Sequence, residues 1–273
     1  LIELLLTNGA DPNLESRDDR TPLQNAVYYQ CGLKVTEALL EGGADPTKNQ
    51  FEAVHAAIRA NDTEMLNLYL DHGVDLGALE GDDIHSFMAS TGGDEVLLLM
   101  KERGFQWNDH PTNEENVTLL HLASRNGNVY ACELFLRQGA DVNAGDEQGT
   151  TPLHIAAQIR NSEMCTLFLN HNANINAIDE EGAPPLHVAL RTGNTETCLL
   201  LLSQGADVNM RGKQGATPFH LVHRCSIEIV QALLDAGAEV NARDGTGLTP
   251  LDSLSRGRDF EEMKAFLIDH GAK

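Results

Sequence analysis

Three side chains within residues 149–165 have types that could perform nucleophilic chemistry. The stretch GTTPLHIAAQIRNSEMC places the hydroxyl of Thr151 three residues before the imidazole of His154, and the thiol of Cys165 follows eleven residues later. An imidazole beside a hydroxyl or a thiol is the pairing that activates a nucleophile in many hydrolases. Such a site also needs a third, orienting group and an enclosed pocket.

The same pattern recurs along the chain, which argues against a catalytic role. It reappears in RTPLQNAVYYQC (20–31), VTLLHLASRNGN (117–128), APPLHVALRTGN (183–194) and ATPFHLVHRC (216–225). Positions equivalent to Thr151 recur every 30 to 36 residues, at Thr21, Glu52, Asp82, Thr118, Thr151, Pro184, Thr217 and Thr249. A second marker, Gly-Ala-Asp or a variant of it, keeps the same period. A motif that recurs at this period indicates a repeated structural unit instead of an active site.

Each unit contains the signals of two helices. Thr151 is a favourable N-cap, and Pro152 follows at the first helical position, where a missing N–H costs nothing. Asn161 predicts the start of a second helix, and a residue such as Gly139 ends that helix in the left-handed conformation. The unit is therefore predicted to be a helix, a turn, a second helix and an extended loop. One such hairpin cannot bury its apolar faces alone, but a stack of hairpins can.

The stretches GTTPLHIAA…LFLNHNANINA and GATPFHLVH…ALLDAGAEVNA resemble ankyrin repeats. The resemblance covers almost the whole chain, strongly between residues 117 and 250 and weakly between 47 and 116. It implies an all-α solenoid of stacked helix–turn–helix repeats with projecting hairpin loops, in which the first helices line a concave face. We expect a single domain, 1–273, divided into a partial repeat at 1–14 and repeats at 15–46, 47–76, 77–111, 112–144, 145–177, 178–210, 211–242 and 243–273, those within 47–111 being degenerate.

The repeat gives the histidines and cysteines structural roles, so no catalytic role is needed to account for them. Six histidines share the slot of His154, and we expect them to hydrogen-bond the loop backbone: His55, His85, His121, His154, His187 and His220. Cys132, Cys165 and Cys198 share a slot in successive second helices, where cysteine behaves as a small buried hydrophobe. Because no CxxC pair occurs, we expect free thiols in a reducing cytoplasmic or nuclear compartment. His220, His223 and Cys225 lack a fourth metal ligand, so no metal site and no cofactor is predicted.

The charge of the chain restricts its partners. The chain has 41 acidic and 19 basic residues and a formal net charge of −22. Nucleic acid and anionic membrane surfaces both require a positive footprint, so neither is expected as a partner. The sequence contains no long apolar run that would span a membrane. We expect a monomer that binds another protein with a basic or mixed-charge surface.

Candidate binding residues fall into three groups. An arginine row seven residues after the markers should face the concave side and could hold a partner's carboxylates: Arg59, Arg125, Arg191, Arg224 and Arg256. The alternative is that these arginines only solvate the helix ends. The predicted hairpin tips are acidic at Asp146, Glu147, Glu180 and Glu181 and basic at Arg211 and Lys213. Trp107, the only tryptophan, is either a binding hot spot or a plug in loosely packed repeats.

No unrepeated cluster of nucleophile, base and oxyanion donors is present, so an enzyme within these residues is not expected. The resemblance implies a non-catalytic protein–protein interaction module or scaffold that binds through the concave face and the loop tips. The alternative is a regulatory or substrate-recruiting region of a larger multidomain enzyme with its catalytic domain outside this sequence. The chain begins within a predicted second helix, LIELLLTNGAD, so we expect further sequence upstream.

Overall fold

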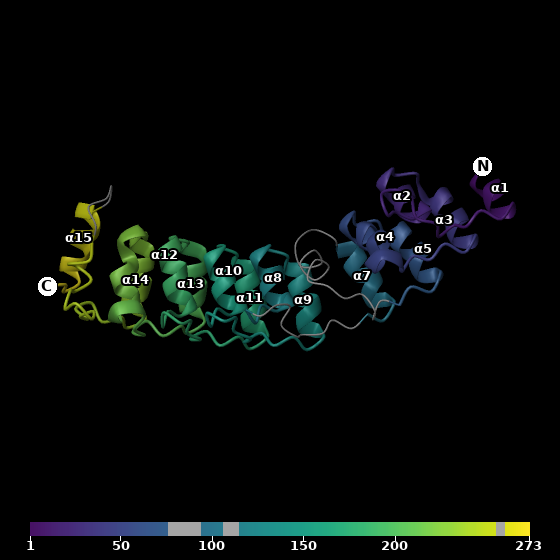
Figure 1. Ribbon diagram of the computed structural model, residues 1–273. Helices are drawn as coiled ribbons and strands as arrows, with labels where there is room; N and C mark the ends of the chain where they lie inside the picture. The colour runs from purple at the N-terminus through teal and green to yellow at the C-terminus, as the bar shows by residue number, and fades with distance from the viewer. Residues whose placement is uncertain (76–93, 106–114, 255–259) are drawn as a thin grey trace. The chain divides into compact units, whose positions relative to one another are not determined.

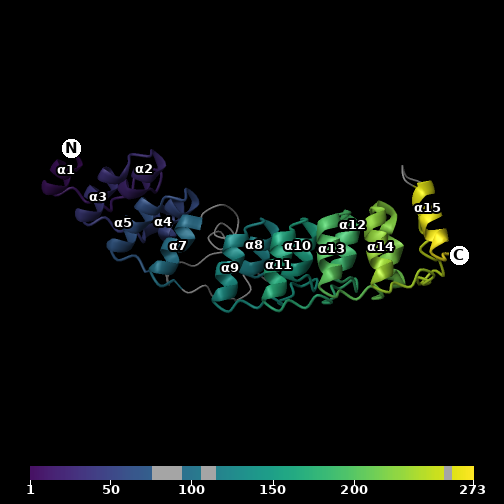
Figure 2. The same ribbon diagram turned by 180° about the vertical axis from the view of Figure 1, so that it is seen from behind.

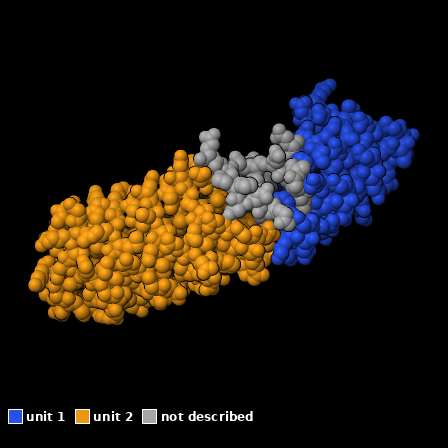
Figure 3. All heavy atoms as spheres, turned by 90° about the horizontal axis from the view of Figure 1, so that it is seen from below, with its two compact units in different colours: residues 1–108 blue, residues 109–273 orange. Residues whose placement is uncertain are grey.

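The structure is a computed structural model that describes residues 1–75, 94–105, 115–254 and 260–273, except for the side chains of Gln50 and Arg224 (Figure 1). Within these ranges the chain forms helices and turns and no strand. It divides into two compact units, residues 1–108 and 109–273, which Figure 3 colours separately. The predicted all-α architecture of helix pairs is confirmed, while the repeat boundaries stay a prediction.

Unit 2 consists of two layers of helices, seen from opposite sides in Figures 1 and 2. The first layer contains α8 (Leu119–Arg125), α10 (Pro152–Gln158), α12 (Pro185–Thr192) and the 3-10 helix η3 (Pro218–Arg224). The second contains α9 (Val129–Arg137), α11 (Ser162–Asn170), α13 (Thr195–Ser203) and α14 (Ile227–Asp235), and α15 (Phe260–Asp269) follows. Apart from α15, each helix contacts its neighbours in its own layer and its partner in the other layer.

Unit 1 repeats this arrangement with fewer regular elements. Its helices are α1 (Ile2–Thr7), α2 (Pro22–Tyr28), α3 (Leu33–Glu41), α4 (Lys48–Arg59), α5 (Thr63–Asp71) and α7 (Asp94–Glu102). The first helices α2 and α4 pack together, and the second helices α1, α3, α5 and α7 form a consecutive series of contacts. The buried apolar positions of these helices are occupied mainly by Leu, Ala, Val and Met, which form the core between the layers.

The second helices begin and end where the sequence predicts. The side-chain oxygens of Asn128, Asn161 and Asn194 each accept a hydrogen bond from the backbone N–H three residues later, at 2.9, 2.9 and 3.0 Å. Past the other end, Gly139 has a φ of 99°, and Asn172 takes the same left-handed region with a φ of 64°. Polar caps and left-handed residues therefore set the length of these helices.

The first helix of the unit at 217–225 differs from the predicted α-helix. Residues 218–224 form the 3-10 helix η3, and Ser226 caps α14 only nine residues after Thr217. In the preceding units this interval is ten residues, and it includes a left-handed residue such as Arg160 (φ 63°) or Gly193 (φ 67°). Because that residue is deleted here, the first helix meets its partner through a shorter turn and winds more tightly.

The repeated histidines link each unit to the next. His154 Nδ1 accepts the backbone N–H of Thr151 at 3.1 Å, and its Nε2 lies 3.0 Å from the carbonyl oxygen of Ala183 in the next unit. A carbonyl oxygen can only accept and a backbone N–H can only donate, so the ring is the neutral Nε2–H tautomer. His121 and His220 make the same two hydrogen bonds. The predicted role in loop hydrogen bonding is confirmed for these three rings.

The threonines of the motif act mainly through the imidazole. At Thr21 and Thr118 the hydroxyl accepts the N–H of the third residue along, at 3.3 and 3.4 Å, as an N-cap does. The hydroxyls of Thr118 and Thr151 also lie 2.8 Å from Nδ1 of His121 and His154, respectively. In the first unit Gln24 replaces the histidine, and its Oε1 accepts the N–H of Thr21 at 2.8 Å. The Thr–His pair therefore caps the helix. Both ring nitrogens of His154 are engaged in hydrogen bonds to the backbone, so the ring is not placed to act as a base for a nucleophile.

His187 occupies the same slot but lacks one of the two hydrogen bonds. Its Nε2 lies 3.0 Å from the carbonyl oxygen of Ala216, whereas its buried Nδ1 has no hydrogen-bond partner. The threonine position of the motif, three residues before His187, is occupied by Pro184, which has neither a backbone N–H nor a hydroxyl. A buried polar atom without a partner reduces the free energy of unfolding.

We therefore expect Pro184→Thr to raise the free energy of unfolding by about 1 kcal/mol. Threonine gives Nδ1 of His187 a hydrogen-bond partner, and part of this gain is lost because the proline no longer restricts the unfolded chain. The Thr151–Pro152 pair shows that threonine fits before proline at this position. Pro184→Ala restores only the N–H, so its gain should be smaller. Urea unfolding followed by circular dichroism measures both variants, and a Pro184→Thr protein less stable than wild type would contradict the assignment.

Side chains from the loops form a second link between units. Asn143 Oδ1 accepts the backbone N–H of Asn174 at 2.6 Å, and its Nδ2 donates to the carbonyl of Asn172 at 3.2 Å. Equivalent hydrogen bonds are made by Asn13, Asn209 and Asn241. Successive hairpins are also joined directly, because Glu180 N–H donates to the carbonyl of Gln148 at 2.8 Å. Each repeat is therefore held by its neighbours in the chain.

Candidate functional site

The three buried cysteines are packing residues. Cys132, Cys165 and Cys198 are fully buried, and burial raises the pKa of each thiol to about 12. A thiol with such a pKa is almost entirely protonated at neutral pH and is a poor nucleophile. Within the ranges that the structure describes, no group of His, Cys, Asp and Glu side chains is arranged to hold a metal ion, and no helix is long and apolar enough to cross a membrane.

The arginine row of unit 2 is paired with carboxylates of the same chain. Arg125 Nη2 lies 3.1 Å from Asp146 Oδ2, and the side chain of Asp146 is only 2% exposed. Arg191 Nη1 lies 3.4 Å from Glu181 Oε2. Arg224 is the last residue of η3, and its side chain is outside the described part of the chain. Arg125 and Arg191 are half-exposed on the first-helix side, but their guanidinium groups already bind an acceptor.

Glu181 joins the arginine row to the basic hairpin tip. Its second oxygen accepts a hydrogen bond from Lys213 Nζ. The hydrogen bond and charge of Lys213, with a smaller contribution from Arg191, hold the pKa of Glu181 below its usual range. Arg211 is exposed, and its Nη1 donates to the carbonyls of Gly215 at 3.1 Å and Arg243 at 2.7 Å. The predicted basic tip is thus partly used to hold the hairpins together.

Aspartates fix the shape of the acidic hairpins. Asp146 Oδ1 accepts the backbone N–H groups of Gln148 and Thr150 at 3.1 and 2.8 Å. Asp179 Oδ1 does the same for Glu181 and Ala183, at 2.9 and 2.8 Å. The predicted tip residues Glu147 and Glu180 lie between these groups, and both side chains are exposed. The hairpins therefore present carboxylates beside the first-helix face on a backbone that is held in place.

Two hollows follow each other along the first-helix side of unit 2. The larger measures about 440 Å³ and is lined by Arg125, Asp146, Gln148, Thr150, Ile155, Gln158 and Ile159. The other measures about 280 Å³ and is lined by Thr150, His154, Gln158, Asp179, Val188, Arg191 and Thr192. Thr150 and Gln158 line both hollows, so the two adjoin. Arg125, Asp146 and Arg191 of the predicted set lie in this part of the surface.

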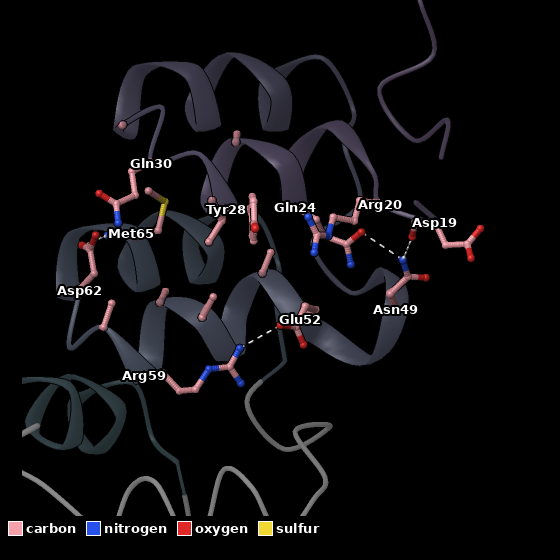
Figure 4. Close-up of a pocket in the computed structure, with 17 residues that line it drawn as sticks. Asp19, Arg20, Gln24, Tyr28, Gln30, Asn49, Glu52, Arg59, Asp62 and Met65 are labelled. Carbon is pink, nitrogen blue, oxygen red and sulfur yellow. Dashed lines mark hydrogen bonds and ion pairs between the residues drawn. The ribbon is translucent and has the colours of Figure 1, made fainter. Parts of the chain in front are cut away.

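Unit 1 has a hollow of its own between α2 and α4, with a volume of about 730 Å³ (Figure 4). Alanines of α4 form much of its lining, and polar side chains surround them. Arg59, predicted from the sequence, lies here, with its Nη2 2.9 Å from Glu52 Oε1. The guanidinium carbon of Arg20 lies 4.1 Å from the ring centre of Tyr28, which is 62% exposed.

Sequence reasoning identified Arg59 in this hollow but missed Arg20 and Tyr28. Tyr28 occupies the slot of the arginine row, seven residues after Thr21, so its position in the repeat was the available signal. Exposed tyrosine and arginine are enriched at the energetic centres of protein interfaces. The predictions for Trp107 and Arg256 fall outside the described residues.

The family of the chain follows from its repeat. A family model that describes three consecutive ankyrin repeats matches the chain at residues 1–80, 86–179, 120–212, 159–244 and 186–273. Ankyrin repeats generally mediate protein–protein interactions and are typically non-catalytic. The matches overlap and together extend over both units. The chain belongs to the ankyrin-repeat family.

Proposed function

We propose that the chain is a non-catalytic protein-interaction module that binds its partner through the first-helix side and the hairpin tips of unit 2. The observation that carries this proposal is the pair of adjoining hollows, both lined by charged and apolar side chains. Such open hollows along a surface suit an extended segment of another protein better than a small molecule, which requires enclosure. Their apolar contribution comes from Ile155, Ile159 and Val188.

The chemistry of the tips supports a partner with a basic or mixed-charge surface. Glu147 and Glu180 are exposed beside the hollows, and the net charge of the whole chain is −22. Complementary charge at the rim of an interface speeds association and selects partners. Five free thiols, three of them buried, support a reducing cytoplasmic or nuclear environment for a monomer of this kind.

Charge reversal at the tips tests the proposal. A partner is first identified by affinity purification and mass spectrometry, and its association is then measured with the Glu147→Lys, Glu180→Lys double variant. We expect association to slow by about tenfold or more, because two rim charges are reversed. The control is Glu163→Lys with Glu228→Lys, which makes the same charge change at exposed positions of α11 and α14.

The two double variants separate a local surface from a general effect of net charge. If both slowed association equally, or if neither did, the tips and first-helix side of unit 2 would not be the binding surface. Circular dichroism of both proteins should match wild type, because all four glutamates are exposed.

A further inference from the structure

The two hollows of unit 2 are built from the same positions, displaced by one repeat. Arg125, Asp146, Ile155, Gln158 and Ile159 of the larger hollow correspond to Gln158, Asp179, Val188, Arg191 and Thr192 of the smaller one. Every residue of the second set lies 33 positions after its counterpart in the first set. The chain thus provides an internal comparison between two copies of one site.

In the larger hollow both oxygens of the carboxylate are occupied. Asp146 Oδ1 accepts two backbone N–H groups of its own hairpin, and Oδ2 lies 3.1 Å from Arg125 Nη2. Arg125 reaches Asp146 from the preceding first helix, α8. The site therefore shows how a guanidinium group is held at this position of the repeat.

In the smaller hollow no guanidinium group stands at the position that Arg125 occupies in the larger one. Gln158 stands in the position of Arg125, and its side chain is exposed and makes no hydrogen bond to any described residue. Asp179 Oδ1 holds its hairpin as Asp146 does, but Oδ2 accepts no hydrogen bond within the described part of the chain. The Asp179 side chain is half-buried. A carboxylate shaped for a guanidinium thus lies open in the hollow.

Arg191, which also lines the smaller hollow, is already paired with a carboxylate. Arg191 is paired with Glu181, because the carboxylate position of the next repeat is Gly212. A Cβ added to Gly212 would lie 2.9 Å from His187 Cδ2, so a side chain at this position would require the His187 ring or the hairpin backbone to shift. Arg191 therefore has no counterpart of Asp146 ahead of it and turns to its own hairpin. The result is an unpaired acceptor at Asp179 with an apolar wall at Val188.

We propose that the smaller hollow receives an arginine side chain of the partner protein, whose guanidinium group takes at Asp179 the place that Arg125 takes at Asp146. The partner's guanidinium donates to Asp179 Oδ2, and its aliphatic stem lies against Val188. A guanidinium, with its planar set of donors, matches a carboxylate better than an ammonium group does. This inference rests on the proposed function and adds the chemistry that the partner must supply.

The direct test uses a blocked pentapeptide, alanine with a central arginine, and the same peptide with citrulline, the neutral isostere of arginine. Both are titrated into the 15N-labelled chain at neutral pH. We expect the arginine peptide to shift the amide signals of residues 158, 179–183 and 188, with the citrulline peptide binding roughly fivefold more weakly. Asp179→Asn should reduce binding of the arginine peptide by a similar factor, because the amide keeps Oδ1 for the hairpin. Equal binding of the two peptides, or no shift at these residues, would overturn the proposal.

Exchanging the residues of the two hollows gives a second test with opposite outcomes. Gln158→Arg should pair with Asp179 within the chain and abolish binding of the arginine peptide. Arg125→Gln should open Asp146 and create a second site, seen as new shifts at residues 125 and 146–150. Both variants place a residue that the row already contains, so they should fold as wild type does. Retention of the peptide by a folded Gln158→Arg protein would contradict the inference.

The same variant distinguishes this inference from the proposed function. If Gln158→Arg kept full affinity for the identified partner while the Glu147→Lys, Glu180→Lys protein lost it, the arginine site would be wrong and the interaction surface would stand. If neither variant affected the partner, the surface itself would be wrong.

Discussion

Acidification from about pH 7 to about pH 5.5 is expected to lower the free energy of unfolding of unit 2 by about 3 kcal/mol. Burial lowers the pKa of His121, His154 and His187 below the ordinary value of 6.5. In the unfolded chain these rings bind a proton as the pH falls through about 6.5, whereas in the folded chain they bind it only at a lower pH. Their contribution to stability is therefore complete above that pH and is lost below it, by roughly 1 kcal/mol for each ring.

The hydrogen bonds of these rings explain the direction of the shift. At His121 and His154 a proton on Nδ1 would face the N–H of the preceding threonine, so the charged ring cannot keep both of its hydrogen bonds. The carboxylates with lowered pKa values, Glu181, Asp244 and Asp252, titrate below their ordinary values of 4.5 and 3.8 and do not contribute in this window.

Urea unfolding at several pH values measures the effect, with His154→Gln as the control. Gln24 shows that a glutamine oxygen can hold the threonine N–H in this slot. The control should lose about a third of the pH dependence, because one of three titrating rings is removed. Stability that stayed constant between pH 7 and 5.5, or rose as the pH fell, would contradict the assignment of neutral structural rings.

Phe168→Ala is expected to cost about 3–5 kcal/mol of the free energy of unfolding. The Phe168 side chain is completely buried on α11, a second helix that packs against both α9 and α13. Truncation removes its apolar contacts and leaves a cavity between helices that hydrogen bonds on both sides hold in place. Because each repeat is stabilised by its neighbours, both interfaces of this repeat are weakened together.

Phe168→Leu is the matched control for the cavity. Leu201 occupies the corresponding position one repeat later, also fully buried, so leucine is compatible with the helix and its neighbours. Its cost should be well below that of alanine, at about 1 kcal/mol. Chemical denaturation followed by circular dichroism compares the three proteins, and equal losses for alanine and leucine would show that packing volume is not the cause.

The features that repeat locally could be predicted from the sequence. Asn161 and Asn128 start helices, Gly139 ends one, and Cys165 is buried, because each is dictated by the backbone conformation or helix face of its own unit. The structural, non-catalytic role of His154 could also be predicted, because the residue recurs at the same position in several repeats. The shortened turn before Ser226 was visible as a single missing residue, but its consequence, a 3-10 helix, depends on packing against two neighbours.

The candidate site was harder to predict, because its properties come from pairs of residues on different repeats. The row position of Arg125 and Arg191 indicates where their backbone lies, but not that the chain itself supplies Asp146 and Glu181 as acceptors. The contrast between Asp146 and Asp179 appears only when the residue one repeat earlier is compared. The hollow between α2 and α4 likewise depends on how two helices of unit 1 pack.

The most direct test of the repeat as a structural device, with its imidazoles as links between units, is the protonation state of each ring. A long-range 1H–15N spectrum at neutral pH distinguishes the two neutral tautomers from the charged ring. For His121, His154, His187 and His220, the hydrogen bonds predict the Nε2–H tautomer with an unprotonated Nδ1. Nδ1–H tautomers, or rings that exchange between forms, would contradict the claim that these histidines hold the stack together.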